Sequence, residues 1–334
     1  MNENIRQLGQ LSDVQLHDKF FKITFGMKES VRNYLIHFFR KKIVAKLDLD
    51  SLTPEPTEFI SPKMNAYFSD VLWRCKLKNG VDINIAFLFE HKSYPEKYHH
   101  VQILRYMVEI WENCIANNLP LTPIVPIIVY HGEAAWHYKP FESLFPNLPS
   151  EFKDFLPCFH YHLTDLKDYS KDMLIHLEAG VLVNAFMMMK HYKDKDFLKN
   201  CVEYIFHGAD SFWDDESKRK FKEALLVYFI KMSELRREDL VNYIEPKLIE
   251  SLKKEAMSTW DNLIAEGKAQ GINLGIEKGI EKGIEKGIEK GIEIPVINAF
   301  KKGKSVEEIA YFNDLPVEKV KEIIDRFKKS LGQN

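Results

Sequence analysis

Several features that would define a class of protein are scarce or missing in this sequence. Its 334 residues include only four cysteines, which lie far apart at positions 75, 114, 158 and 201. They show no metal-ligand spacing, and we expect a reduced, cytoplasmic protein. No apolar run approaches about 18 residues, and the N-terminus lacks a basic region followed by an apolar run. We therefore expect neither a membrane span nor a signal peptide.

An excess of one charge is also missing. The formal net charge is -2, from 47 basic and 49 acidic residues, so no overall positive field points to nucleic acid. Any such contact must come from a local patch. Hydrophobic residues make up 45% of the chain, which is enough for a sizeable core, and the length suggests about two domains.

The order of apolar patterns indicates an α/β fold with a sheet in the middle. Residues 1–45 show helical spacing, and prolines then interrupt the pattern. The segments that follow are two strands joined at Lys78-Asn79-Gly80, a helix and a short β-branched strand, over residues 69–77, 81–89, 100–117 and 124–130. Residues 165–260 are expected to be mainly helical. We interpret Met187-Met188-Met189 as core filling rather than as a soft interaction surface.

Residues 267–291 are of low complexity, with glycine at every fourth position and the unit Gly-Ile-Glu-Lys from Gly275 onward. Seven glycines each cost a helix about 1 kcal/mol, so an isolated helix here is expected to be marginal. Two interpretations stay open. The segment is a semi-flexible spacer, or its Ile and Gly stripes pair helices from two copies in a homo-oligomer.

Helical patterning resumes from Pro295 to Leu331, with a short helix predicted over residues 296–300. Ser305 and Glu308 form a capping-box pattern, and Pro316 favours the start of a third helix. The small Ala310 between short helices is typical of a helix-turn-helix unit that contacts DNA. A generic three-helix packing unit is the alternative.

The chemistry is predicted at a strand end, in Phe89-Glu90-His91-Lys92. Residues i and i+2 of a strand share a face, so Glu90 and Lys92 point one way and His91 the other. Across the predicted hairpin, Asp70 lies at the start of the partner strand, as far from Gly80 as Glu90 is. Two carboxylates suit Mg²⁺, or Mn²⁺, which would lower the pKa of a bound water and offset charge on a scissile phosphate.

The alternative is an ordinary cross-strand salt bridge. Three features favour a site: Asp70 lies at the matching strand end, the residues before Glu90 are apolar, and the next helix presents Gln102 and Tyr106 one turn apart on one face. Lys92 would position water or stabilise developing charge.

Together these motifs resemble the PD-(D/E)XK nuclease superfamily and, more narrowly, the recombination-promoting nuclease (Rpn) or transposase family. The matching segments cover residues 17–22, 70–72, 89–93, 104–107 and 127–132, and the repeats and tail are also similar. The resemblance implies a restriction-endonuclease-like mixed sheet core, DNA as partner, and metal-dependent cleavage linked to recombination and mobile elements. Ser69 replaces the usual proline before Asp70, whereas Lys92 is closer to the superfamily pattern than the glutamine frequent in the family.

The roles of several other residues are predicted with alternatives. Asp18 and Glu29 are candidates for a further metal ligand, and Asp18 is equally suited to cap a helix. His91 is interpreted as packing, His99 and His100 as solvated loop residues, and His131 as capping a loop. Phosphate or base contacts are considered for residues near the site, namely Tyr94, Lys97, Tyr98 and Arg105.

The chain is accordingly divided into four parts: a nuclease core over 1–165, a helical extension over 166–262, a repeat spacer over 263–293 and a helix-turn-helix-like tail over 294–334. The predicted function is a Mg²⁺-dependent DNA endonuclease. The alternatives are a non-catalytic DNA-binding or assembly protein on the same scaffold, and a nuclease that cleaves RNA.

Overall fold

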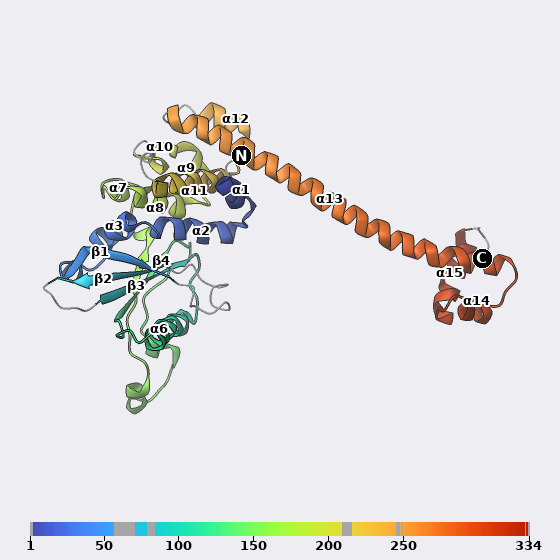
Figure 1. Cartoon of the computed structure of the whole chain (residues 1–334), viewed down its shortest axis with the longest axis horizontal. Helices are drawn as coiled ribbons and strands as arrows, with labels where there is room; N and C mark the ends of the chain where they lie inside the picture. The colour runs from blue at the N-terminus through green and yellow to red at the C-terminus, as the bar shows by residue number, and fades with distance from the viewer. Residues whose placement is uncertain are drawn as a thin grey trace. The chain divides into compact units, whose positions relative to one another are not determined.

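The computed structural model describes residues 3–56, 71–78, 84–208, 216–244, 248, 250–330 and 332. It confirms the α/β class, with a five-stranded mixed sheet flanked by helices (Figure 1). The strands lie side by side in chain order: β1 Leu47–Glu55, β2 Val71–Leu77, β3 Asn84–Lys92, β4 Ile124–Tyr130 and β5 His162–Asp165. The pairs β1–β2 and β2–β3 are antiparallel, and the pairs β3–β4 and β4–β5 are parallel.

Three of the five strands are predicted, β2 and β3 from alternation and β4 from its β-branched run, whereas β1 and β5 are not. Strand β1 contains Pro54 and shifts its register against β2 between Asp48 and Thr53. Proline and a bulge are tolerated there because β1 is at the edge of the sheet. Strand β5 has only four residues, too few for a periodic pattern. Asn79 and Gly80 of the predicted turn lie outside the described residues.

Among the described residues, four helices precede the sheet, and the second and third of them pack on one of its faces. The four helices are α1 Glu3–Gln10, α2 Asp13–Phe25, α3 Lys28–Phe38 and α4 Lys41–Val44. Phe89 of β3 points to this face, where its ring lies 4.8 Å from that of Phe25 and 5.2 Å from that of Tyr34. Aromatic pairs of this kind bury large areas and fix the α2–α3 pair on the sheet.

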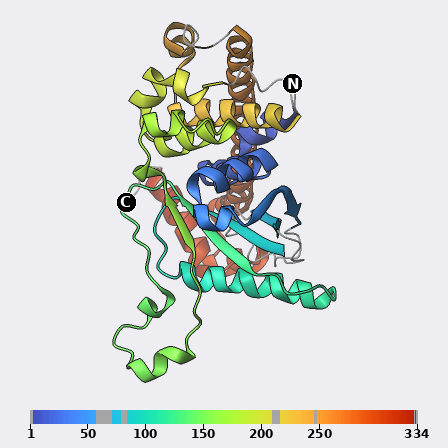
Figure 2. The same cartoon turned by 90° about the vertical axis from the view of Figure 1, so that its left-hand side faces the viewer.

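Helix α6, His99–Ala116, connects β3 to β4 and covers the opposite face. Its buried residues Ile103, Tyr106 and Ile110 pack with Leu88 of β3 and Ile128 of β4 in a second, smaller core. Because α6 links two parallel neighbours, β3, α6 and β4 form a β-α-β unit. The chain between β4 and β5, green in Figure 2, leaves the sheet and carries the 3₁₀ helices η1 Phe141–Leu144 and η2 Ser150–Phe155.

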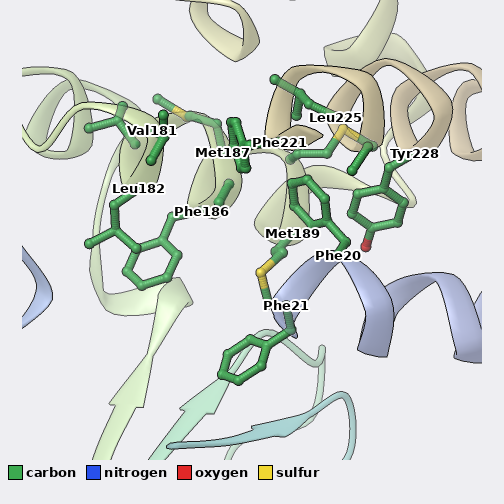
Figure 3. Packing of buried hydrophobic residues seen from close by; sticks show 14 of the residues in the cluster. Phe20, Phe21, Val181, Leu182, Phe186, Met187, Met189, Phe221, Leu225 and Tyr228 are labelled. Atoms are coloured by element: carbon green, nitrogen blue, oxygen red, sulfur yellow. The ribbon is translucent and has the colours of Figure 1, made fainter. Parts of the chain in front are cut away.

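A helical layer follows β5 and packs on α2. It consists of η3 Leu166–Asp168, α7 Lys171–Ile175, α8 Val181–His191, α9 Lys195–Asn200, α10 Val202–Ile205, α11 Glu216–Ser233, α12 Arg237–Asp239 and the π-helical turn η5 Leu240–Ile244. Met187, Met188 and Met189 are fully buried in the core that this layer shares with Phe20 and Phe21 of α2, which confirms their interpretation as core residues (Figure 3).

The glycine repeats are helical in the whole chain, and the marginal stability expected of an isolated repeat helix stays a prediction. They belong to α13, Glu250–Lys301, which also contains the predicted short helix 296–300 and has Pro295 within it. Leu252 and Ala256 near its start and Val296 near its end pack into cores. Folded contacts at both ends supply the nucleation that an isolated repeat peptide lacks, and propagation then adds one hydrogen bond per residue.

By contacts, the chain forms two compact units, Met1–Ile264 and Ala265–Asn334. The second unit has a small core built by the end of α13, α14 Val306–Phe312 and α15 Val317–Ser330. The predicted capping box is present: Ser305 Oγ accepts from Glu308 N at 3.2 Å, and Ser305 N donates to a Glu308 carboxylate oxygen at 2.9 Å. DNA contact by this unit stays a prediction. In the described part of the chain, none of the helices has the length and apolar character needed to cross a membrane.

Candidate active site

The end of strand β3 places two charges in the protein interior. Glu90 and Lys92 are 4% and 7% exposed, and Lys92 Nζ lies 3.0 Å from Glu90 Oε1. They share a face because side chains alternate along a strand. A buried ion pair of this kind is costly to desolvate and contributes little net stability, so it favours a functional role over a packing one.

Helix α6 contributes two more polar side chains to the same face. Lys92 Nζ donates to Gln102 Oε1 at 3.2 Å. Tyr106, one turn further along α6, is almost fully buried and lines the same small cavity as Glu90, Lys92 and Gln102. The cavity measures about 10 Å³, about the size of one water molecule. The predicted residues of β3 and α6 are therefore brought together.

Glu96, in the loop between β3 and α6, is a site residue that the sequence analysis did not identify. Lys92 Nζ donates to Glu96 Oε2 at 2.8 Å, and Gln102 Nε2 donates to Glu96 Oε1. Burial alone lowers the pKa of Lys92, but the charges of Glu90 and Glu96 outweigh it and raise that pKa above its usual value. Lys92 is therefore a cation. Its four-residue separation from Glu96 was the available indication in the sequence.

Asp70, the predicted partner of Glu90, lies outside the described residues. Its chain neighbour Val71 pairs with Phe89, which precedes Glu90, so the described start of β2 adjoins the strand end that carries the site. Within the described residues, no three His, Cys, Asp or Glu side chains form a group that could hold a metal ion. Mg²⁺ characteristically uses one or two carboxylates and keeps several waters, and the oxygen donors of Glu90 and Gln102 have the hard chemistry that it prefers.

The two histidines at the start of α6 are buried, which corrects their interpretation as solvated loop residues. His99 Nδ1 lies 2.6 Å from the Glu96 carbonyl oxygen, and His99 Nε2 lies 3.0 Å from the Tyr161 hydroxyl. Burial lowers the pKa of His99 to about 4, so it is neutral. His100 Nε2 lies 2.7 Å from the Lys139 carbonyl oxygen. Spacing alone gave no indication of this burial, because the covering residues come from the distant β4–β5 segment.

His91 points to the other face of the sheet, which confirms its assignment to packing. It stacks on His131 at a ring distance of 4.5 Å, and the two Nε2 atoms lie 2.6 Å apart. His17 of α2 completes the group and hydrogen-bonds to the Tyr228 hydroxyl. We call these three residues, His17, His91 and His131, the histidine cluster. His131 is thus a buried member of this cluster.

The two acidic residues considered as further ligands lie elsewhere. Asp18 is inside α2, whose N-cap is Ser12, so the capping interpretation is wrong. Its Oδ1 lies 3.5 Å from His91 Nδ1, on the side of the histidine cluster. Glu29 pairs with Lys218 at 3.0 Å. These two contacts, which lie within the described structure, do not bring Asp18 or Glu29 to Glu90 and Lys92.

A mixed sheet flanked by helices, with the buried Glu90–Lys92 pair at the end of one strand under the helix that follows it, places the chain in the α/β class. The family model described as "Putative transposase, YhgA-like" matches residues 15–220, which is more than half of the chain. The chain belongs to this family.

Three curated relatives agree with this assignment. The chain is 28% identical over 188 residues to the "Inactive recombination-promoting nuclease-like protein RpnE" of Escherichia coli K12, covering 54% of this chain and 60% of the relative. It is 30% identical over 118 residues to the "Recombination-promoting nuclease RpnD" of E. coli O157:H7, covering 35% and 45%. It is 31% identical over 125 residues to the "Recombination-promoting nuclease RpnA" of E. coli K12, covering 37% and 42%.

The chain spans about half the length of these curated relatives. No solved structure matches it significantly. The Rpn resemblance is therefore confirmed at the level of the family, which includes proteins named as nucleases and a protein named as inactive.

Proposed function

We propose that the protein is a metal-dependent endonuclease that hydrolyses phosphodiester bonds of DNA, in a role linked to recombination or mobile elements. The observation that carries the proposal is the buried pair Glu90–Lys92 at the end of β3, beside the described start of β2. Two relatives named recombination-promoting nucleases support the reaction class and the role.

In this proposal, Asp70 and Glu90 hold Mg²⁺, or Mn²⁺ in its place. The bound ion would lower the pKa of a water molecule and offset negative charge on the phosphate. Lys92, a cation with three donor hydrogens, orients the attacking water or stabilises the developing charge. Gln102 holds the Lys92 ammonium in place, and Tyr106 closes the apolar end of the cavity.

The test is nicking of supercoiled plasmid with Mg²⁺ and with EDTA. We expect wild type to cut only with the metal, and Asp70→Ala and Lys92→Ala to lose cutting. Lys42→Ala serves as the control, because Lys42 lies on α4 and is exposed. If both site variants cut as well as wild type, the assignment of the site is wrong.

A non-catalytic DNA-binding or assembly protein is the second candidate, and the inactive relative RpnE favours it. Binding of DNA by wild type without cleavage in Mg²⁺ or Mn²⁺ would support this non-catalytic candidate. Faster cleavage of RNA than of DNA would favour the RNA-cleaving alternative.

Self-association through the repeats is a further part of the proposal. Ile276, Ile280, Ile284 and Ile288 are all more than half exposed and form an apolar stripe on α13. A sedimentation measurement on wild type and on a variant with these four isoleucines changed to Gln tests it. Equal sedimentation of the two proteins would exclude the stripe as the contact.

A further inference from the structure

A cleft of about 540 Å³ adjoins the candidate active site and has no role in the proposal above. Its walls come from the loop before α6, the first residues of α6 and the β4–β5 segment, with Glu96 and His99 shared between the cleft and the site. The cleft is lined in part by Lys97, Tyr98, His100 and Lys139. This volume is in the range of about 300–1,000 Å³ that encloses a single small molecule, and is too small for a DNA duplex.

The electrostatics of the cleft favour an anion. Lys97 and Lys139 line it and are exposed. Glu96 is the acidic residue among the described lining residues, and its carboxylate is already bound to Lys92 and Gln102. The 18-residue helix α6 begins at the cleft, and in the described structure no side chain caps its N-terminus. The helix dipole and the backbone N–H groups at the start of a helix attract a phosphate.

A second observation points to a ligand with hydrogen-bond donors. His100 is 1% exposed and lines the cleft, and its Nε2 faces the Lys139 carbonyl oxygen, which can only accept. The proton must therefore be on Nε2, so Nδ1 is an acceptor. Within the described residues, Nδ1 has no hydrogen-bond partner. Buried acceptors are almost always paired, so this unmet acceptor in the cleft wall, although covered from solvent, marks a place where a hydrogen-bond donor is expected.

An exposed aromatic ring also lines the cleft. Tyr98, immediately before α6, is 55% exposed, and Lys97 Nζ lies 5.1 Å from its ring centre. An exposed ring beside a lysine is a platform on which an unpaired base stacks while the cation meets the backbone.

We infer that this cleft binds one nucleotide of a single DNA strand next to the scissile phosphate. Its phosphate lies at the N-terminus of α6 between Lys97 and Lys139, and its base stacks on Tyr98. The preferred substrate is then single-stranded or locally unpaired DNA, because a base inside a duplex cannot reach the ring. The position of this nucleotide beside the scissile phosphate rests on the proposed nuclease function. The binding itself is independent of catalysis.

The test is fluorescence anisotropy with a labelled 12-nucleotide oligo(dT), the matching duplex and oligo(U), in EDTA and again with Ca²⁺. We expect Tyr98→Ala to weaken oligo(dT) binding about ten-fold or more, and Tyr98→Phe to bind within two-fold of wild type, because the ring remains. The double variant Lys97→Ala/Lys139→Ala removes the contact with one phosphate and should reduce the slope of log affinity against log salt by about 0.7. Lys42→Ala on α4 is the matched control and should not change the affinity.

Three results overturn the inference: no binding of oligo(dT) in either buffer, equal affinity of Tyr98→Ala and wild type, or an equal loss in Tyr98→Ala for duplex and single strand. Tighter binding of oligo(U) than of oligo(dT) would overturn the assignment to DNA. Circular dichroism melting of each variant excludes misfolding as the cause of lost affinity.

The two proposals fail separately. If the cleft variants lose oligo(dT) binding but wild type never cuts, the cleft assignment stands and the nuclease proposal fails. If Asp70→Ala abolishes cutting while the cleft variants bind oligo(dT) as wild type does, the nuclease stands and the cleft assignment fails.

Discussion

The two faces of the sheet at the end of β3 bury different kinds of polar side chain. On one face, Glu90 and Lys92 are buried as charges, with Lys92 bound also to Glu96. On the other, His91 is buried in the histidine cluster beside α2. These are neighbouring residues of one strand, so the difference comes from what covers each face.

The two faces differ in whether their buried titratable side chains are neutral or charged. Histidine can enter a core as a neutral ring, and burial lowers the pKa of His17 to about 3 and that of His131 well below its ordinary value. The cluster is thus compatible with the large apolar core around it. A lysine next to two carboxylates keeps its charge, and that charge requires fixed partners, which Glu90 and Glu96 supply. Retained charge marks the face where chemistry is expected.

The largest expected effect compares activity on the two faces. Glu90→Gln should reduce plasmid nicking by at least about 100-fold, the loss typical of removing one charge-stabilising group from an active site. His91→Gln should retain nicking within a few-fold below its melting temperature, because His91 faces away from the site. Initial rates at 20 °C on both purified variants measure this. A greater loss in His91→Gln would reverse the functional assignment of the faces.

The second prediction concerns the free energy of unfolding. Lys92→Met leaves the buried carboxylate of Glu90 without its ion-pair partner, and breaking such a pair costs about 3–5 kcal/mol. Lys218→Met, which removes a partly exposed ion pair with Glu29, should cost at most about 1 kcal/mol. Urea unfolding at pH 7.5 compares the two. A Lys92→Met protein as stable as wild type would show that the pair is not a buried charge pair.

The histidine cluster predicts acid sensitivity. An unfolded histidine binds its proton near pH 6.5, whereas folded His17 binds it only near pH 3, so the unfolded state gains protons first as the pH falls. Stability should therefore fall from pH 6.5 downward, by up to about 1.4 kcal/mol per pH unit for each such histidine. His17→Gln should reduce this slope in urea unfolding at pH 7, 6 and 5. An unchanged slope would contradict the neutral, buried state of His17.

The smallest expected effect concerns Glu96, which is one-quarter exposed at its side chain. Glu96→Gln keeps a hydrogen-bonding group beside Gln102 but removes one negative charge from Lys92. The loss of stability should be at most about 1 kcal/mol, and the pKa of Lys92 should decrease. Glu133→Gln, from the exposed pair with Lys193, is the control and should be neutral within error. A loss of several kcal/mol in Glu96→Gln would place Glu96 with Glu90 as a core charge.

Much of the fold could be predicted from local patterns. The strand 124–130 is a short β-branched run with both ends marked by proline or glycine, and it matches β4. The capping box at Ser305 depends on two residues three positions apart, and the structure contains it. Edge strand β1 could not be predicted because proline and charged residues obscure its pattern, and its partner β2 lies beyond a long connection.

The site residues likewise divide into those that local spacing predicts and those that it does not. The shared face of Glu90 and Lys92 depends only on strand alternation, and Gln102 and Tyr106 share a face by helical spacing. Glu96 was missed because it lies in a loop, where no periodicity predicts the direction of a side chain. His99 and His100 were assigned to solvent because the β4–β5 residues that bury them, including Tyr161 and Lys139, are about 40 to 60 positions away.

By itself, the sequence determined the alternation of β3, the apolar face of α6 and the caps, because these depend on residues within a few positions of one another. It also contained the motifs that relate the chain to its family. Only the tertiary structure decided which polar groups stay charged, because desolvation and ion pairing depend on side chains from distant segments. The difference in charge between Glu90–Lys92 and the histidine cluster therefore depends on the packing of α6 and α2 on opposite sides of the same strand.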